Sequence, residues 1–333
     1  MTGGGAGRAA ARVTARRAIA GALLASLGAA TARAQQTAAT PVEVQMRHVD
    51  FRVDSTVVLR IAWLRGRLER TAADQPPYFD DKRSFALAID TARIAVTPTS
   101  LGALLNHHVF AYRGSPLRGL TVSVSRGRLY QHGKLRGIGF TIESEASLTP
   151  AGEIRLHPTS IKVAGLSVGG LLELFGLELQ KLVNLEGARG VRLEGNDFVL
   201  SPTGLLPPPA IRGRVGAIEV LDTAIVQVFV PPGEARAKPL TPPDTSAANY
   251  MYFRGGTLRF GKLTMHDADL EIVDADPRDP FDFFLDRYNL QLVAGYSKNT
   301  PEHGLVVTMP DFLRARALLR RGGLRPERGE SGR

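Results

Sequence analysis

One short segment of this chain carries a serine in a catalytic spacing. Residues 165–169 (GLSVG) match G-x-S-x-G, the nucleophile elbow of serine esterases and lipases. The elbow requires a strand before the serine and a helix after it, and the apolar stretch over residues 167–184 predicts such a helix. In the chain order that this motif requires, only His266 or His303 could follow as the base. Asp267, Asp269 or Asp279 could be the acid for His303, and we take Ser167, Asp279 and His303 as the candidate triad.

The rest of the chain offers little support for hydrolysis at Ser167. Strands and helices do not alternate along it, and no HGGG-type oxyanion loop is present. A serine at a helix start also caps the helix through its side-chain oxygen, and the flanking glycines permit a turn and close packing. The sequence therefore favours a structural Ser167 and leaves a serine hydrolase as an alternative.

Two further clusters contain metal-binding residue types at unsuitable spacings. His107 and His108 are adjacent on a predicted helix, where side chains about 100° apart do not readily share one ion. The acidic run from Asp267 to Asp282 lacks the Gly at position 6 and the Glu at position 12 of an EF-hand loop. The chain has no cysteine, which removes disulfides and thiolate ligands. We therefore expect neither a metal nor a cofactor.

The two ends of the chain differ from its body. Residues 1–34 combine a basic start, an uncharged apolar run and small residues before Gln35, which predicts a signal peptide and an exported, periplasmic or envelope-associated protein. The net charge of +10 includes +5 from residues 1–34 and +4 from the basic tail, residues 311–333, leaving about +1 for the body. A nucleic-acid-binding protein would carry its basic face on the folded part, so we exclude that class.

Most of the body shows patterns typical of long β-strands. Val57, Leu59, Ile61 and Trp63 alternate with smaller or polar residues, and a period of two indicates a strand. Such patterns continue to residue 230, and turns are predicted at Arg126-Gly127, His132-Gly133 and Ala151-Gly152.

Helices are predicted at only two places, near residues 98–110 and over 167–184. Long strands with one apolar face must pack that face against something. We therefore expect a mainly β (α+β) fold for residues 35–230, with a long, highly curved antiparallel sheet wrapped around one or both helices and enclosing an apolar groove. Five prolines predict a linker or lid over residues 231–249, and residues 250–310 are expected to extend the same sheet.

Two groups near the C-terminus are candidates for membrane contact. Phe281, Phe283 and Phe284 lie beside the acidic run, and we interpret them as core anchors, with a bilayer-contacting rim as the alternative. Residues 311–322 form a basic amphipathic stretch of the kind that rests on anionic lipid headgroups, and its candidate contacts are Phe312, Leu313, Arg314, Arg316, Arg320 and Arg321. A membrane surface is therefore a second expected partner, with a soluble tail as the alternative.

The order of motifs over residues 117–229 resembles a known family. It runs FTIESE, GEIRL, IKVAG, an apolar stretch, GVRLEGNDFVL and IRGRVGAIEV. This order is similar to that of LmeA-type bacterial phospholipid-binding proteins, which have TULIP-like lipid-binding folds, and residues 250–274 resemble a strand pair of AsmA-like envelope proteins. The resemblance implies a curved sheet around a helix, with a groove that holds the acyl chains of a phospholipid or another lipid.

We therefore predict an exported envelope protein that binds or shuttles a lipid without chemistry of its own. The expected lining is a set of large apolar side chains on the two predicted helices: Leu101, Leu104, Leu105, Val168, Leu171, Leu172, Leu174, Phe175, Leu177 and Leu179. Two alternatives remain. One is a serine hydrolase, which loses activity in Ser167→Ala while keeping its fold. The other is a structural envelope protein with a packed core and no ligand.

Overall fold

The computed structural model describes residues 40–164, 166–167, 185, 187–231, 233 and 237–321. The chain divides into Met1–Thr40 and a compact unit, Pro41–Arg333, and the fold below is that of the second unit. The predicted signal peptide lies outside the described residues. So does the helix predicted over 167–184, except for Ser167, whose backbone ends a short strand.

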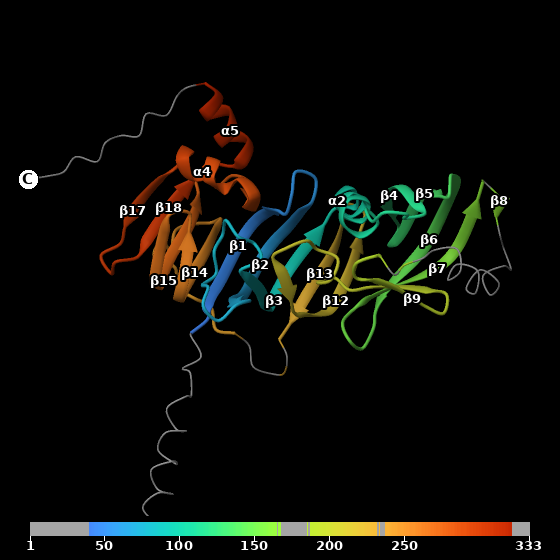
Figure 1. Ribbon diagram of the computed structural model, residues 1–333, viewed down its shortest axis with the longest axis horizontal. Helices are drawn as coiled ribbons and strands as arrows, with labels where there is room; N and C mark the ends of the chain where they lie inside the picture. Colours follow the sequence, from blue (N-terminus) through green and yellow to red (C-terminus); the bar gives the residue numbers. More distant parts are fainter. Residues whose placement is uncertain are drawn as a thin grey trace, which may run out of the picture. The chain divides into compact units, whose positions relative to one another are not determined.

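The Pro41–Arg333 unit is mainly β and contains two open sheets (Figure 1). The larger sheet has eleven strands in the order β12-β13-β3-β2-β1-β14-β15-β18-β17, with β11 paired to β3 and β16 to β1. Its strands are β1 (Val42–Arg52), β2 (Val58–Arg70), β3 (Phe85–Val96), β11 (Ala210–Arg212), β12 (Arg214–Leu221), β13 (Ala224–Val230), β14 (Tyr250–Phe260), β15 (Leu263–Asp274), β16 (Phe281–Phe284), β17 (Tyr296–Asn299) and β18 (Leu305–Met309).

The eleven-stranded sheet is mixed, which corrects the prediction of a single antiparallel sheet. β1 pairs antiparallel with β14 along its first half and parallel with β16 along Val49–Arg52. β11 runs parallel to β3, and β18 runs parallel to β15. A parallel pair needs a crossover between its strands. The segment between β15 and β18 contains α4 (Tyr288–Ala294) and β17, a length that strand periodicity alone does not reveal.

A bulge in β2 changes the predicted alternation. Leu59 and Ile61 face the core as expected, but the register between β2 and β3 shifts between Ile61 and Trp63. An extra residue in one strand reverses the faces of the residues beyond it. Trp63 is therefore 41% exposed, while Leu64 is 1% exposed and takes the core position.

The second sheet is an insertion between two neighbouring strands of the first. The chain leaves β3, forms α2 (Pro98–Leu104) and the π-helix η2 (Leu105–Val109), builds the seven-stranded sheet, and returns at β11 beside β3. The path of the second sheet is β4-β5-β6-β7-β10-β9, and β8 pairs with β7. Its strands are β4 (Leu117–Ser125), β5 (Arg128–Leu135), β6 (Ile138–Leu148), β7 (Ile154–Val163), β8 (Leu166–Ser167), β9 (Val191–Glu194) and β10 (Asp197–Leu200).

The hairpin turns of the second sheet follow glycine chemistry, with one difference from the prediction. Arg126-Gly127 turns between β4 and β5 with positive φ at both residues, as hairpin turns require. The next turn falls at Arg136-Gly137, whereas Gly133 lies inside β5. A Cβ at Gly133 would meet Leu120 Cδ2 at 2.7 Å, so this glycine allows close packing between strands rather than a turn.

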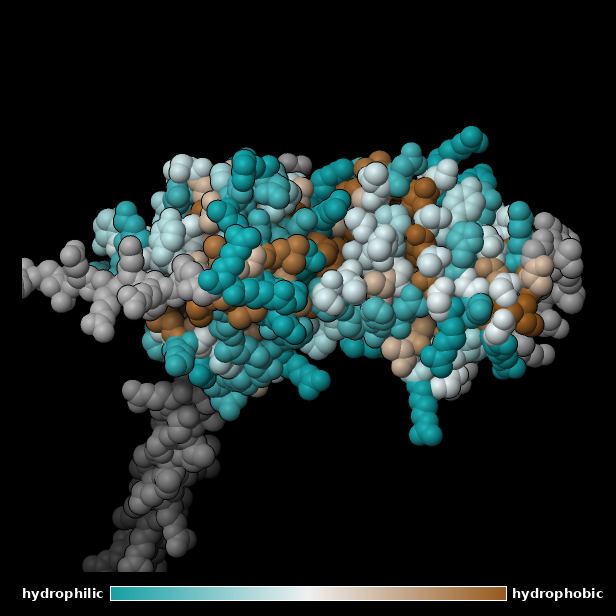
Figure 2. Space-filling view, turned by 90° about the horizontal axis from the view of Figure 1, so that it is seen from above, coloured by the Kyte–Doolittle hydropathy of each residue, from teal (hydrophilic) through white to brown (hydrophobic). Residues whose placement is uncertain are grey.

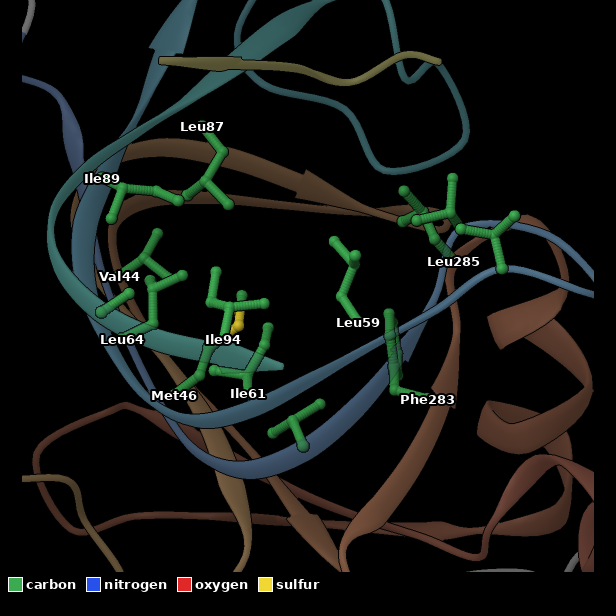
Figure 3. Close-up of a cluster of buried hydrophobic side chains, with 14 of the residues drawn as sticks. Val44, Met46, Leu59, Ile61, Leu64, Leu87, Ile89, Ile94, Phe283 and Leu285 are labelled. Carbon is green, nitrogen blue, oxygen red and sulfur yellow. The ribbon is translucent and has the colours of Figure 1, made fainter. Parts of the chain in front are cut away.

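The core of the first sheet is apolar and rich in aromatic rings. Side chains of β1, β2 and β3 point toward one another, with Phe283 and Leu285 across from them (Figure 3). Phe79, in the loop before β3, contacts the rings of Phe85, Phe253, Phe260 and Tyr288 with centroid separations of 5.2–5.9 Å. Offset or edge-on aromatic pairs add to the stabilisation from burial alone, which fixes this loop against the sheet.

The segment predicted as a linker or lid is attached to the first sheet along its described part. The Gln45 amide exchanges two hydrogen bonds with the Leu240 backbone, at 2.8 and 2.9 Å. Arg65 Nε donates to Lys238 O at 3.0 Å. The Asp244 N–H donates to Glu271 Oε2 at 2.6 Å. Residues 238–244 therefore lie across β1, β2 and β15.

Candidate functional site

A strongly apolar cavity lies on the second sheet beside α2 and η2. Its volume is about 120 Å³. Sixteen of its eighteen described lining residues are apolar, and the two exceptions are Thr121 and Gln131. The lining is Leu101, Leu105, Phe110, Leu117, Leu120, Thr121, Val122, Leu129, Gln131, Leu135, Phe140, Ile142, Leu156, Ile161, Val163, Val191, Phe198 and Leu200. We call this space the first cavity. Cavities lined in this way stay dry and accept apolar groups.

Two smaller cavities share lining residues with the first or with each other. The second cavity, about 60 Å³, shares four residues with the first: Leu101, Leu129, Leu156 and Leu200. The third cavity, about 30 Å³, shares five residues with the second: Leu59, Ile89, Ile94, Leu206 and Ile211. Several residues of the third cavity appear in Figure 3. The second cavity is therefore lined by residues of both sheets.

Three leucines predicted from the helix near 98–110 line these cavities. Leu101 borders the first and second cavities, Leu105 the first and Leu104 the second. Thr97 caps α2 by accepting a hydrogen bond from the Ser100 N–H, as threonine does before a helix. The predicted lining residues Val168, Leu171, Leu172, Leu174, Phe175, Leu177 and Leu179 lie outside the described residues.

A side-chain amide ties the helical segment to the second sheet. Asn106 Nδ2 donates to Leu120 O at 2.6 Å, and the Leu120 N–H donates to Asn106 Oδ1 at 2.9 Å. Asn106 thus binds β4 much as a neighbouring strand would, because it offers one donor and one acceptor. This pair of hydrogen bonds positions Leu105 over the first cavity.

Gln131 is the one lining residue of the first cavity with an unused buried hydrogen-bond donor. Its Oε1 accepts a hydrogen bond from Ser144 Oγ at 3.1 Å, and Ser144 is fully buried. Its Nε2 is buried and has no hydrogen-bond partner among the residues that the structure describes. Most buried polar groups are paired, and an unpaired one costs roughly 1–3 kcal/mol.

The hypothetical hydrolase triad is not assembled. Ser167 ends β8 at the edge of the seven-stranded sheet, whereas His303 lies in the turn between β17 and β18 of the other sheet. These strands lie at opposite ends of the Pro41–Arg333 unit in Figure 1. Asp279 is exposed, and among the described residues no hydrogen bond joins it to His303.

The adjacent histidines have separate partners in the loop between β1 and β2. His108 Nε2 lies 2.6 Å from Asp54 Oδ2, and His107 Nδ1 lies 3.4 Å from Thr56 Oγ1. Burial favours a higher pKa for Asp54, but hydrogen bonds from His108, Thr56 and Val57 outweigh it and lower the pKa to about 2. This pair joins η2 to the first sheet.

The acidic run is held by hydrogen bonds and arginines. Arg52 pairs with Asp282, and both Arg278 and Arg314 pair with Asp276. Burial raises the pKa of Asp311 to about 6, although its carboxylate accepts a hydrogen bond from the Asp282 N–H. Within the described part of the chain, no group of three His, Asp or Glu residues is placed to hold a metal ion.

The four phenylalanines among the candidate membrane contacts are buried, which agrees with the interpretation of Phe281, Phe283 and Phe284 as core anchors and removes Phe312 from the candidates for membrane contact. Phe281 and Phe283 are fully buried, and Phe284 packs edge-on against Phe312 at 4.8 Å. Rings enclosed by protein have no surface to offer a bilayer. The contact between Phe284 and Phe312 holds α5 (Phe312–Arg320) against β16 of the large sheet.

Other candidate membrane contacts remain on the surface. Leu313 and Arg314 are exposed, as are Arg316, Arg320 and Arg321. Hydrophobic residues reach the surface at several places on the face drawn in Figure 2. No helix within the described ranges is long and apolar enough to cross a bilayer.

Sequence reasoning missed the strand residues that form most of the cavity lining. Leu129, Gln131 and Leu135 sit at alternate positions of β5, and all three face the first cavity. Their period of two was present in the sequence. The sequence did not indicate which of the two faces of β5 would be covered by other elements.

Comparison with protein-family models, with curated proteins and with solved structures found no match to this chain. The resemblance to LmeA-type and AsmA-like proteins therefore stays a prediction that rests on the quoted sequence motifs.

Proposed function

We propose that this chain is an exported envelope protein that binds or shuttles a lipid, and that it holds the acyl chains in the three cavities. The observation that carries the proposal is the shared apolar lining of these cavities across two sheets. In this proposal the sheets curve around the ligand and the helix predicted over 167–184, forming an apolar groove.

Acyl-chain burial would supply the affinity. Each methylene transferred from water to an apolar site contributes about 0.8 kcal/mol. No lysine, arginine or carboxylate is among the described lining residues of the first cavity, so a charged headgroup finds no partner there and would remain at the mouth. The proposal thus concerns the apolar portion of a phospholipid or another acyl lipid.

Native mass spectrometry of the protein purified without detergent tests the proposal. We expect adducts in the mass range of phospholipids, which disappear after extraction with organic solvent. An unchanged protein mass, both as purified and after incubation with phospholipid vesicles, would contradict lipid binding and favour a packed structural protein.

A matched pair of variants locates the binding. Leu101 borders both the first and second cavities, so Leu101→Trp should fill part of that space and reduce the adducts. Leu263 is exposed at the turn between β14 and β15, so Leu263→Trp adds the same bulk away from the cavities. Thermal unfolding establishes that both variants are folded. Equal adduct levels in the two variants would place the lipid elsewhere.

A further inference from the structure

The polar group of the first cavity has a defined orientation. Ser144 has one hydroxyl hydrogen, which it donates to Gln131 Oε1, so the oxygen side of the amide faces Ser144. The Nε2 side is left buried and unpaired among the described residues. The neighbours of Gln131 across β4 and β6 are Val122 and Ile142, and neither carries a side-chain acceptor.

An unpaired donor in an apolar space is complementary to a narrow class of ligands. The complement is a neutral acceptor oxygen attached to hydrocarbon, because a charged group would lose its hydration without gaining a counter-ion. An acyl carbonyl fits this description, whether it belongs to an ester-linked lipid or to the protonated, neutral form of a free fatty acid. An alkyl ether offers only a weaker, less accessible acceptor, and a plain alkane offers none.

We propose that Gln131 Nε2 donates a hydrogen bond to the acyl carbonyl oxygen of a ligand in the first cavity, and that Ser144 positions the amide for it. This inference rests on the proposed lipid binding and adds a specificity: the cavity distinguishes acyl lipids from alkyl ether lipids with the same chains and headgroup. The ligand would then supply Nε2 of Gln131 with the partner that it lacks among the described residues.

The test compares a short-chain diester phospholipid, below its micellar concentration, with its dialkyl ether analogue and with a free fatty acid. Dissociation constants are measured by titration of the full chain. We expect the wild-type protein to bind the diester roughly tenfold more tightly than the diether, the effect of one buried hydrogen bond. In Gln131→Leu, which keeps the bulk and removes the donor, this preference should vanish through weaker diester binding.

The control is Gln75→Leu, because Gln75 lies in the loop before β3, outside the described linings of the three cavities, and gives the same change of side chain there. This variant should retain the tenfold preference. A fatty acid whose affinity also falls in Gln131→Leu would identify a carboxyl as an accepted source of the carbonyl, and an unaffected fatty acid would restrict the interaction to esters.

Two outcomes distinguish a failure of the role of Gln131 from a failure of lipid binding itself. Equal affinity of the wild-type protein for diester and diether would overturn the role of Gln131 while lipid binding itself stands. Absence of binding to any of the three ligands would overturn both this role and the proposed function. The wild-type comparison decides the question even if Gln131→Leu does not fold.

Discussion

Glu271 should make the stability of this protein fall as the pH rises through neutrality. Its side chain is 0% exposed in the middle of β15. Oε2 accepts the hydrogen bond from the Asp244 N–H, and Oε1 has no hydrogen-bond partner among the described residues. Burial raises the pKa of Glu271 to about 7, and the negative charges of Asp244 and Asp269 act in the same direction.

The sign and size of the effect follow from proton binding. Between its ordinary pKa of 4.5 and the folded value of about 7, the folded chain keeps a proton that the unfolded chain releases. This contribution to stability is fully present below pH 4.5 and is lost as the pH rises through 7. The loss amounts to about 3 kcal/mol.

Glu271→Gln replaces the titrating group with a neutral one of similar shape. We expect its free energy of unfolding to fall less between pH 5 and pH 8.5 than that of the wild type, and to exceed it at pH 8.5. Urea unfolding followed by circular dichroism at several pH values measures both quantities. The control is Glu302→Gln, an exposed position that should retain the wild-type pH dependence.

Asp311, Asp50 and Asp274 also have raised pKa values, so the wild type and both variants share a background slope of the same sign. The comparison between variants isolates the part due to Glu271. The reasoning is refuted if Glu271→Gln keeps the wild-type slope, or if it is less stable than the wild type at pH 8.5.

Three further predictions concern single positions that the structure singles out. Gly66→Ala should strongly destabilise the protein, because a Cβ would lie 2.2 Å from a carbonyl oxygen of β3. A Cβ at Gly139 would meet open space, so the thermal unfolding temperature of Gly66→Ala should be clearly lower than that of Gly139→Ala. Phe79→Ala should lower the free energy of unfolding by about 3–5 kcal/mol in urea titrations, and a loss below 1 kcal/mol would show that its ring contacts do not hold the loop. Asp54→Asn should cost about 1–2 kcal/mol at pH 7, allowing for partial exposure, and should remove the stability that the wild type loses as the pH falls from about 4 to 2. An Asp54→Asn curve parallel to the wild type below pH 4 would mean that the pairing with His108 does not stabilise the fold.

Local patterns in the sequence predicted many of the elements. A period of two marks a strand wherever one face is covered, and Pro98 predicted a helix start that the structure contains. Arg126-Gly127 predicted a turn, and both residues adopt positive φ there. These signals work because each depends on the conformations available to a few neighbouring residues.

The arrangement of the strands depended on contacts distant in sequence. Periodicity does not distinguish one sheet from two, so it could not show that residues 117–200 form a separate sheet inserted beside β3. It also could not predict the bulge that turns Trp63 outward, or the place of Gly133 inside a strand rather than at a turn. The separate sheet, the bulge and the position of Gly133 all depend on which strands pair and in which register.

By itself, the sequence determined a mainly β chain with few helices, no cysteine chemistry and basic residues concentrated at its ends. Only the tertiary structure decided which apolar faces meet and which polar atoms lose water. It enclosed Phe281 and Phe283, gave the first and second cavities shared leucines in their walls, and left Gln131 Nε2 and Glu271 Oε1 without partners among the described residues. The physical reason is that burial and hydrogen-bond satisfaction are properties of surroundings, and here the surroundings come from strands far apart along the chain.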